Sequence, residues 1–306
     1  MLEPVAPICL YLTGTIPFPY LNVCGHEFTG TVKQIGQGVN SKWLGKTVTA
    51  EINNTCIAYN RKSLCSACKN GLPSHCLERT VTGIIQHSGA FAEEIAVAAG
   101  TLHEIPDSVG SLTATLTEPL AAALQTFNMS PITKEETIVV LGPGRLGILI
   151  VFVAALKGLN VLAVSRSEAK RDRALDYGAI WTCSPDEAEV LIRKNTEGLG
   201  ADLVVDTTGN PDGITQSLKL VRPRGTVCCK TTSGLPSKGL DMTSLVVGEL
   251  QLQGSRCGPF EPALEILKTH HDKLKHLITS TRPLEETQAA LESASKENKV
   301  VISMKI

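Results

Sequence analysis

The sequence lacks an excess of charge of either sign, a basic leader segment, internal repeats and low-complexity tracts. Its 306 residues carry a formal net charge of -1, which removes the attraction that nucleic acids and anionic membranes exert on basic proteins. The first residues include Glu3 and no basic stretch before an apolar one, so no secretory signal is predicted. We therefore expect a cytoplasmic protein that acts on a small, neutral molecule, with neither a nucleic acid nor a membrane as partner.

The sequence also lacks a credible membrane span. The one long apolar run, LGILIVFVAALKGLNVLAV, contains Lys157 and two glycines and is better explained as a buried helix followed by a strand. A hydrophobic content of 42% with 19% charged residues excludes general disorder. The chain is long enough to bury two cores.

The chain has two parts with different sequence patterns. Residues 1–105 contain short β-like runs, FTGTVKQIG, GKTVTAEIN and GAFAEEIAVA, which predict a small barrel-like all-β unit. From Ser111, SLTATLTEPLAAALQTF has helical spacing, and strand-like and helix-like segments then alternate, which predicts a parallel sheet with crossover helices. Helices and a last strand, KVVISMKI, follow Gly258 and are expected to fold back onto the first unit. The predicted domains are 1–118 with 259–306, and 119–258.

A glycine-rich turn marks the start of the second domain. TIVVLGPGRLGILIVF places the glycines between a β-branched strand and a long helix, the context in which a GxGxxG pattern binds a dinucleotide pyrophosphate at a helix N-terminus. A plain glycine-rich turn is the alternative. The predicted cofactor-binding residues of this turn are Gly142, Gly144, Arg145, Leu146 and Gly147.

The second strand of this domain, NVLAVS, predicts which dinucleotide binds. An NAD enzyme carries an acidic residue at its tip to accept the ribose 2'-hydroxyl, whereas this chain has Ser165, Arg166 and Ser167. A guanidinium and two hydroxyls can bind a 2'-phosphate, so NADP(H) is favoured over NAD(H). Lys170 can add charge there, or be an ordinary surface lysine; Arg166 can also be simply solvated.

Ten cysteines in a reducing compartment point to metal or thiol chemistry. LCSACKNGLPSHC contains Cys65, Cys68 and Cys76, and Cys56 precedes it; this pattern favours a structural, tetrahedral Zn²⁺ without an open position. The segment between Cys56 and Cys65 is longer than the two residues between Cys65 and Cys68, which makes Cys56 less certain as a ligand than the other three. His75 is a possible substitute ligand, and buried free thiols are the alternative to a metal site.

Together with GHEFTG (25–30), TEPLAAAL, RPRGTV (222–227) and GSRCGPF (254–260), these motifs resemble the medium-chain dehydrogenase/reductase family. The similarity covers nearly the whole chain and is to the zinc-containing alcohol, sorbitol and threonine dehydrogenases. It implies an α/β fold, a Rossmann doubly wound parallel sheet plus a GroES-like β-barrel catalytic domain. It also implies a homodimer or homotetramer, paired through the sheet edge at LQLQGSRC.

The resemblance implies a catalytic zinc held by His26, with Glu27 and Glu118 as carboxylates that bind the metal directly or through water. Each of these residues alone can instead be a helix cap or a buried hydrogen-bonding group. Cys9 stands where the family has another zinc-binding cysteine, but Leu10 follows it where the proton-relay element is expected, and the amino terminus looks shortened. Thr13 or Thr15 could replace the relay hydroxyl. Cys24 is an extra thiol, either a ligand or a small apolar filler.

The resulting hypothesis is a zinc-dependent oxidoreductase that transfers a hydride between a nicotinamide cofactor and an alcohol, aldehyde or ketone. Two alternatives remain. One is a nucleotide- and zinc-binding pseudoenzyme that has lost turnover, and the other is a zinc-free reductase of the same superfamily.

Overall fold

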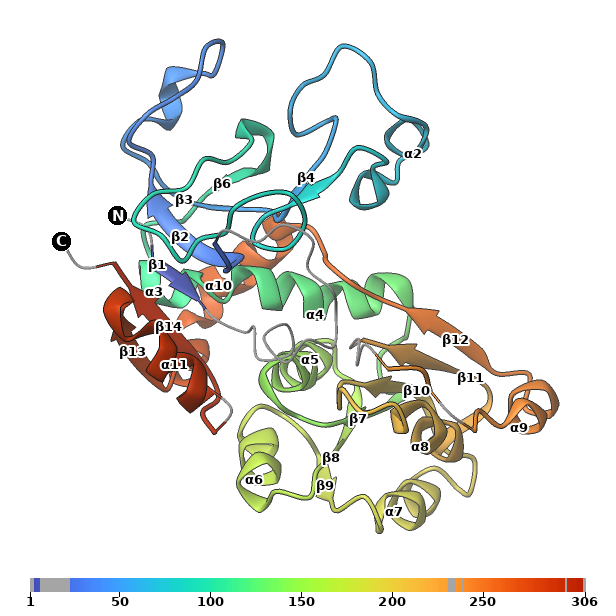
Figure 1. Cartoon of the computed structure of the whole chain (residues 1–306). Helices are drawn as coiled ribbons and strands as arrows, with labels where there is room; N and C mark the ends of the chain where they lie inside the picture. Colours follow the sequence, from blue (N-terminus) through green and yellow to red (C-terminus); the bar gives the residue numbers. More distant parts are fainter. Residues whose placement is uncertain (1–2, 6–22, 231–234, 238, 295, 305–306) are drawn as a thin grey trace. The chain divides into compact units, whose positions relative to one another are not determined.

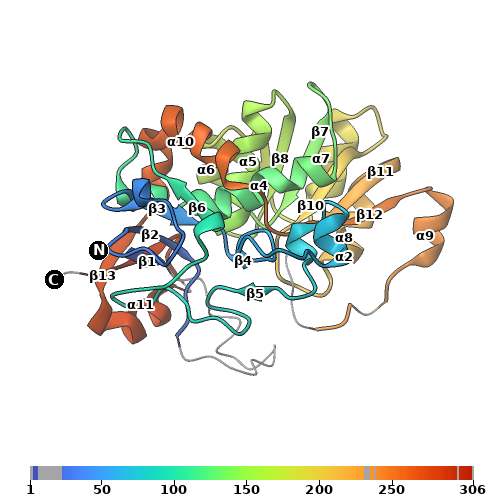
Figure 2. The same ribbon diagram turned by 90° about the horizontal axis from the view of Figure 1, so that it is seen from above.

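The computed structural model describes residues 3–5, 23–230, 235–237, 239–294 and 296–304. The chain folds into two units: unit 1 comprises Met1–Glu118 and Pro259–Ile306, and unit 2 comprises Pro119–Gly258. Figures 1 and 2 show the course of the chain through both. Within the described ranges, no helix combines the length and the apolar character that crossing a bilayer requires.

Unit 2 is built on a six-stranded parallel sheet in the order β12-β11-β10-β7-β8-β9. The chain runs outward from β7 to β9 and then returns to place β10 on the other side of β7. This reversal is the topological switch point at which doubly wound sheets bind their ligands. The predicted fold class, a doubly wound parallel sheet, is confirmed. The strands are β7 (Thr137–Leu141), β8 (Asn160–Val164), β9 (Trp181–Cys183), β10 (Ala201–Asp206), β11 (Val221–Cys229) and β12 (Gln251–Gly254).

The helices of unit 2 explain why its central strands are apolar on both faces. Every residue of β7 is buried, as expected for a parallel strand covered on both sides. α5 and α6 pack against each other, as do α7 and α8. The apolar run considered above folds as α5, whose residues 147–154 are buried, and β8. The helices are α5 (Arg145–Leu156), α6 (Glu168–Asp176), α7 (Ala188–Asn195), α8 (Gly213–Leu220) and α9 (Met242–Val247).

Unit 1 contains a mixed sheet in the order β13-β14-β1-β2-β3-β6. β14 lies between β13 and β1, so strands from the two ends of the chain pair directly. Residues after Gly258 therefore complete unit 1, and α10 and α11 belong to it. The strands are β1 (Glu3–Val5), β2 (Glu27–Thr31), β3 (Thr47–Ala50), β6 (Leu102–Glu104), β13 (Ser280–Pro283) and β14 (Val300–Ser303), and the helices are α10 (Phe260–Leu274) and α11 (Thr287–Ala294).

One predicted strand of unit 1 is wrong. GAFAEEIAVA (89–98) has a strand-like pattern but forms no strand. The amides of Gly89, Ala90 and Phe91 donate to carbonyls of the segment 23–25, so this backbone is satisfied by a loop and does not join a ladder. The helical segment beginning at Ser111 is confirmed, as α3 (Ser111–Ala114) and α4 (Thr117–Met129).

Candidate zinc and dinucleotide sites

Four cysteines meet in a lobe of unit 1, residues 53–81, which we call the cysteine lobe. The short strands β4 (Asn53–Asn54) and β5 (Thr80–Val81) pair at its base and bring the two ends of the lobe together. Cys68 lies in the short helix α2 (Ser66–Lys69) and Cys65 immediately precedes it. Ligand atoms of Cys56, Cys65, Cys68 and Cys76 all lie within 4.8 Å of one another.

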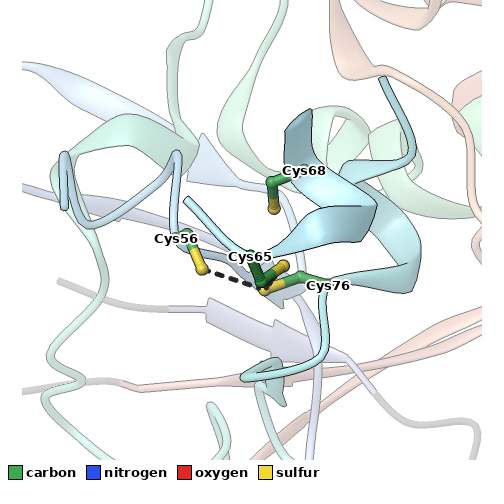
Figure 3. Close-up of side chains that lie close together, drawn as sticks. All are labelled: Cys56, Cys65, Cys68 and Cys76. Carbon is green, nitrogen blue, oxygen red and sulfur yellow. Dashed lines mark hydrogen bonds between the residues drawn. The ribbon is translucent and has the colours of Figure 1, made fainter. Parts of the chain in front are cut away.

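The four sulfur atoms have the spacing of a tetrahedral metal site. The Sγ atom of Cys76 lies 3.4 Å from that of Cys56 and 3.7 Å from that of Cys65, and Figure 3 shows the four side chains pointing toward one another. Zinc–sulfur bonds of about 2.3 Å at tetrahedral angles place sulfurs roughly 3.8 Å apart. The structure thus brings Cys56 into the group in spite of the longer segment that separates it from Cys65.

The thiols of the lobe differ in how readily they ionise. The backbone N–H groups of Cys68 and Leu77 lower the pKa of Cys65 to about 6, and Leu77 N lies 3.4 Å from Cys65 Sγ. Burial raises the pKa of Cys68 to about 12. A buried thiol of this kind becomes a thiolate only beside a cation, so the donor set fits Zn²⁺. His75 is exposed and lies outside the group.

A second group of residues that could hold a metal ion lies elsewhere in unit 1. His26 precedes β2, Glu27 is the first residue of β2, and Glu118 lies in the first turn of α4. One ligand atom from each lies within 4.8 Å of the other two. Nδ1 of His26 is buried and has no hydrogen-bond partner among the described residues. Because burial lowers the pKa of His26, the imidazole is neutral at pH 7 and can donate a lone pair to a metal.

Sequence reasoning missed a fourth member of this group. Lys299, the residue before β14, forms an ion pair with Glu27. Each of the two side chains is only 4% exposed. Removing one partner of such a buried ion pair leaves an uncompensated buried charge, which strongly destabilises the fold. The two residues are 272 positions apart in the sequence, so no local sequence pattern predicts their contact. We refer to His26, Glu27, Glu118 and Lys299 as the His26 site.

The other residues that the sequence suggested for this site are not found in the described group. Cys24 is half-buried, and burial raises the pKa of its thiol. It does not join His26, Glu27 and Glu118 in the described metal-binding group. Cys9, together with Thr13 and Thr15, lies outside the described residues.

The glycine-rich turn of unit 2 follows β7 at the switch point of the sheet. Gly142 has a φ of +82°, a backbone conformation that residues with a Cβ atom rarely adopt. A Cβ at Gly147 would lie 2.3 Å from the carbonyl oxygen of Gly142, so only glycine allows α5 to start this close to the turn. Thr207, after β10, donates its N–H to the carbonyl of Leu141 and its hydroxyl to the carbonyl of Gly142, which holds the turn in place.

The N-terminus of α5 has features that suit an anion. Gly144 is its N-cap and has no side chain that could cap the first amides. A Cβ at Gly144 would meet little nearby, so space remains beside those amides. Arg145 and Leu146 form the first turn. The N–H groups of a helix N-terminus and the positive end of its dipole favour a phosphate at such a position.

The tip of β8 forms a tight loop of three residues, Ser165 to Ser167, which we call the ribose loop. Ser165 donates its N–H to the carbonyl of Cys183, and its hydroxyl oxygen accepts the N–H of Ser167 at 3.2 Å. Arg166 and Ser167 are exposed, as is Lys170 in the first turn of α6. The loop lies at the carboxyl end of its strand, where the adenosine ribose binds in sheets of this topology.

Two sequence families match this chain. Residues 8–107 match the alcohol dehydrogenase GroES-like domain, and residues 146–269 match the zinc-binding dehydrogenase family. An L-threonine 3-dehydrogenase from Caldanaerobacter subterraneus subsp. tengcongensis is 30% identical, covering 88% of this chain and 77% of its own. A sorbitol dehydrogenase from Halalkalibacterium halodurans is 29% identical, with 87% and 78% covered.

Solved structures agree with these matches. A protein from Sinorhizobium meliloti 1021, described as a zinc-binding dehydrogenase and solved with NADP bound, superposes with a TM-score of 0.83 at 28% identity, covering 99% of this chain and 92% of that one. The predicted GroES-like domain and Rossmann sheet are thereby confirmed.

The sheet topology, the glycine-rich turn and the two clusters of candidate metal donors are those of a zinc-binding, dinucleotide-dependent dehydrogenase. With the sequence relatives, the assignment becomes specific: the chain belongs to the zinc-containing, alcohol dehydrogenase-like family of medium-chain dehydrogenases/reductases. It is an NAD(P)-dependent oxidoreductase of the alcohol dehydrogenase type.

Proposed function

We propose that the chain oxidises an alcohol, or reduces an aldehyde or ketone, with a catalytic zinc at the His26 site and NADP(H) preferred over NAD(H). The observation that carries the proposal is the convergence of His26, Glu27 and Glu118, which includes a buried, unpartnered Nδ1 atom. An unpaired nitrogen in a buried polar group is costly unless something binds it. A second, structural zinc is proposed for the cysteine lobe.

The charges of the His26 site suit a metal that must polarise a substrate. When bound, zinc supplies a Lewis acid that lowers the pKa of a substrate hydroxyl, and the nicotinamide accepts or donates the hydride. His26 is neutral, and Lys299 offsets the negative charge of Glu27. The formal charges of these four residues leave a net charge of -1, so the site does not neutralise a divalent ion.

The NADP(H) preference is supported by the ribose loop. Arg166, Ser165 and Ser167 stand at the tip of β8, and Arg166 and Ser167 are exposed to an incoming ligand. No carboxylate occupies the loop, so nothing in it repels a 2'-phosphate or binds a 2'-hydroxyl as strongly as an acidic residue does. The S. meliloti relative, which was solved with NADP, is consistent with this preference.

The test combines a zinc count with a cofactor titration. We expect two zinc ions per chain, a dissociation constant for NADPH about tenfold below that for NADH, and absorbance changes of the nicotinamide with an alcohol. His26→Gln should remove one zinc and turnover, while His75→Gln, a matched change at an exposed histidine, should remove neither. One zinc per chain with cofactor binding and no turnover would contradict the proposal and favour the pseudoenzyme.

The proposal includes a homodimer formed at the edge strand β12. Val246 and Val247 in α9 are 67% and 78% exposed, and Leu252 in β12 is 40% exposed. An open strand edge beside exposed apolar side chains favours pairing with a second copy. Light scattering should show a dimer or tetramer that Leu252→Lys dissociates. A cytoplasmic location is also proposed, because all cysteines in the described part of the chain are free.

A further inference from the structure

Arg171, in α6, forms hydrogen bonds with the backbone of the ribose loop. Its Nη1 atom donates to the carbonyl oxygen of Ser165 at 2.8 Å and to that of Arg166 at 3.2 Å. One guanidinium nitrogen carries two hydrogens, so it can serve both acceptors. These two contacts join the first two residues of the loop to the helix that follows it.

The two contacts orient what the loop presents to a ligand. The carbonyl and N–H of a trans peptide point in opposite directions. With the carbonyl of Ser165 turned toward Arg171, the N–H of Arg166 is turned away from it. The carbonyl of Arg166 is held in the same way, while the N–H of Ser167 is taken by the Ser165 hydroxyl oxygen.

The guanidinium also adds positive charge behind the loop. Arg171 is half-buried, in contrast to the exposed Arg166. Burial raises the pKa of Cys183 to about 11, and Arg171 opposes that rise, so its charge acts on the residue whose carbonyl accepts the Ser165 N–H. A charge fixed behind two ordered peptides is held in position before a ligand arrives, which lowers the cost of ordering the loop on binding.

We propose that Arg171 is a positioning residue for NADP(H): by clamping the carbonyls of Ser165 and Arg166, it fixes the geometry in which the ribose loop binds the adenosine 2'-phosphate. The inference rests on the proposed NADP(H) preference and adds a residue that does not itself contact the cofactor. The matching chemistry is a phosphomonoester on the ribose, so the effect is confined to ligands that carry it.

Adenosine 2',5'-bisphosphate and 5'-AMP test the inference without zinc, nicotinamide or turnover. Calorimetry on the full chain should show that the wild type binds the bisphosphate more tightly than it binds 5'-AMP. Arg171→Met should weaken bisphosphate binding about tenfold and AMP binding less than about threefold, the scale of losing one or two ordering hydrogen bonds. The bisphosphate affinity of Arg171→Lys should fall between those of the wild type and Arg171→Met. Arg173→Met makes the same chemical change on α6, at a residue whose charge acts on Tyr177, and should leave the ratio unchanged.

Hydrogen exchange at Arg166 and Ser167 provides a second readout, because a released loop should exchange faster in Arg171→Met. An unchanged bisphosphate-to-AMP ratio in that variant, or an equal loss for both ligands, would overturn the positioning role and leave the NADP(H) preference intact. A wild-type chain that binds both ligands equally would overturn the preference itself.

Discussion

The cysteine lobe and the His26 site hold metal-binding groups in two different ways. The lobe draws all four donors from one continuous segment of 21 residues, Cys56 to Cys76. The His26 site combines β2, α4 and the residue before β14, and two of its members are 272 positions apart. The lobe depends on local chain geometry, whereas the site exists only after unit 1 has assembled.

The two regions also balance charge differently. The lobe gathers like donors, so its thiolates depend on a cation for charge balance. The His26 site carries its own cation, Lys299, against Glu27. We infer that removing the metal disrupts the lobe more than it disrupts the His26 site, whose polar groups are partly satisfied by the protein itself. The predictions below test that contrast.

The largest effect is expected from opening the cysteine lobe. Cys68→Ala removes a buried donor, and we expect loss of one zinc per chain and several kcal/mol of stability, because coordination stabilises a loop with little core. Cys183→Ala, at a buried thiol of unit 2, should cost only about 1 kcal/mol and leave the zinc count unchanged. Elemental analysis and urea unfolding measure both. An unaltered zinc count in Cys68→Ala would remove the basis for the comparison.

The next effect concerns the charge balance of the His26 site. Lys299→Met leaves Glu27 buried without a partner and should lower the free energy of unfolding of the metal-free chain by about 3–5 kcal/mol. Adding Glu27→Gln should restore much of the loss. Lys268→Met, at an ion pair with half-exposed partners, should cost less than about 1 kcal/mol. Independent, additive effects of the first two substitutions in urea unfolding would show that the pair is not coupled.

A smaller effect is the pH dependence of the metal-free chain. Burial lowers the pKa of His26 below its ordinary 6.5, so as pH falls below 6.5 the unfolded chain takes up a proton that the folded chain does not. His26 therefore lowers stability as pH falls, by at most about 1.4 kcal/mol per pH unit. Urea unfolding between pH 7 and 5 should show a shallower slope in His26→Gln than in wild type. Parallel curves would refute the lowered pKa.

The smallest effect is a difference in reactivity inside the lobe. In the metal-free chain, Cys65, with a pKa of about 6, should be alkylated first, and its rate should rise through that pH as the thiolate forms. Cys68, with a pKa of about 12, should stay unreactive at neutral pH. Peptide mass spectrometry after iodoacetamide treatment distinguishes them. Zinc should protect Cys65, and equal labelling of both thiols would contradict the distinction.

Features encoded locally were predictable from the sequence. The glycines at 142, 144 and 147 were predicted to lie in a turn between a strand and a helix, and β7 and α5 confirm that placement; cofactor binding there stays a prediction. The alternation of elements likewise predicted the parallel sheet. The Cys65, Cys68 and Cys76 spacing is equally local, but Cys56 joins them only because β4 and β5 close the base of the lobe.

Features that depend on tertiary contacts were not predictable. A pattern alone gave no reason for Lys299 to lie against Glu27, since the contact follows from β14 entering the sheet of unit 1. The segment 89–98 alternates like a strand, yet its amides pair with another loop. The two hydrogen bonds of Arg171 were not predictable either, because side-chain contacts to backbone carbonyls leave no characteristic spacing in the sequence.

The return of the chain into unit 1 has a consequence for its synthesis. On the ribosome, unit 2 emerges complete before α10, α11 and β14 have been translated, so it can fold while unit 1 still lacks two strands of its sheet. Lys299 is made 272 residues after Glu27. The carboxylate of Glu27 therefore has no counter-ion from Lys299 until unit 2 has been made, and the sheet of unit 1 is completed late.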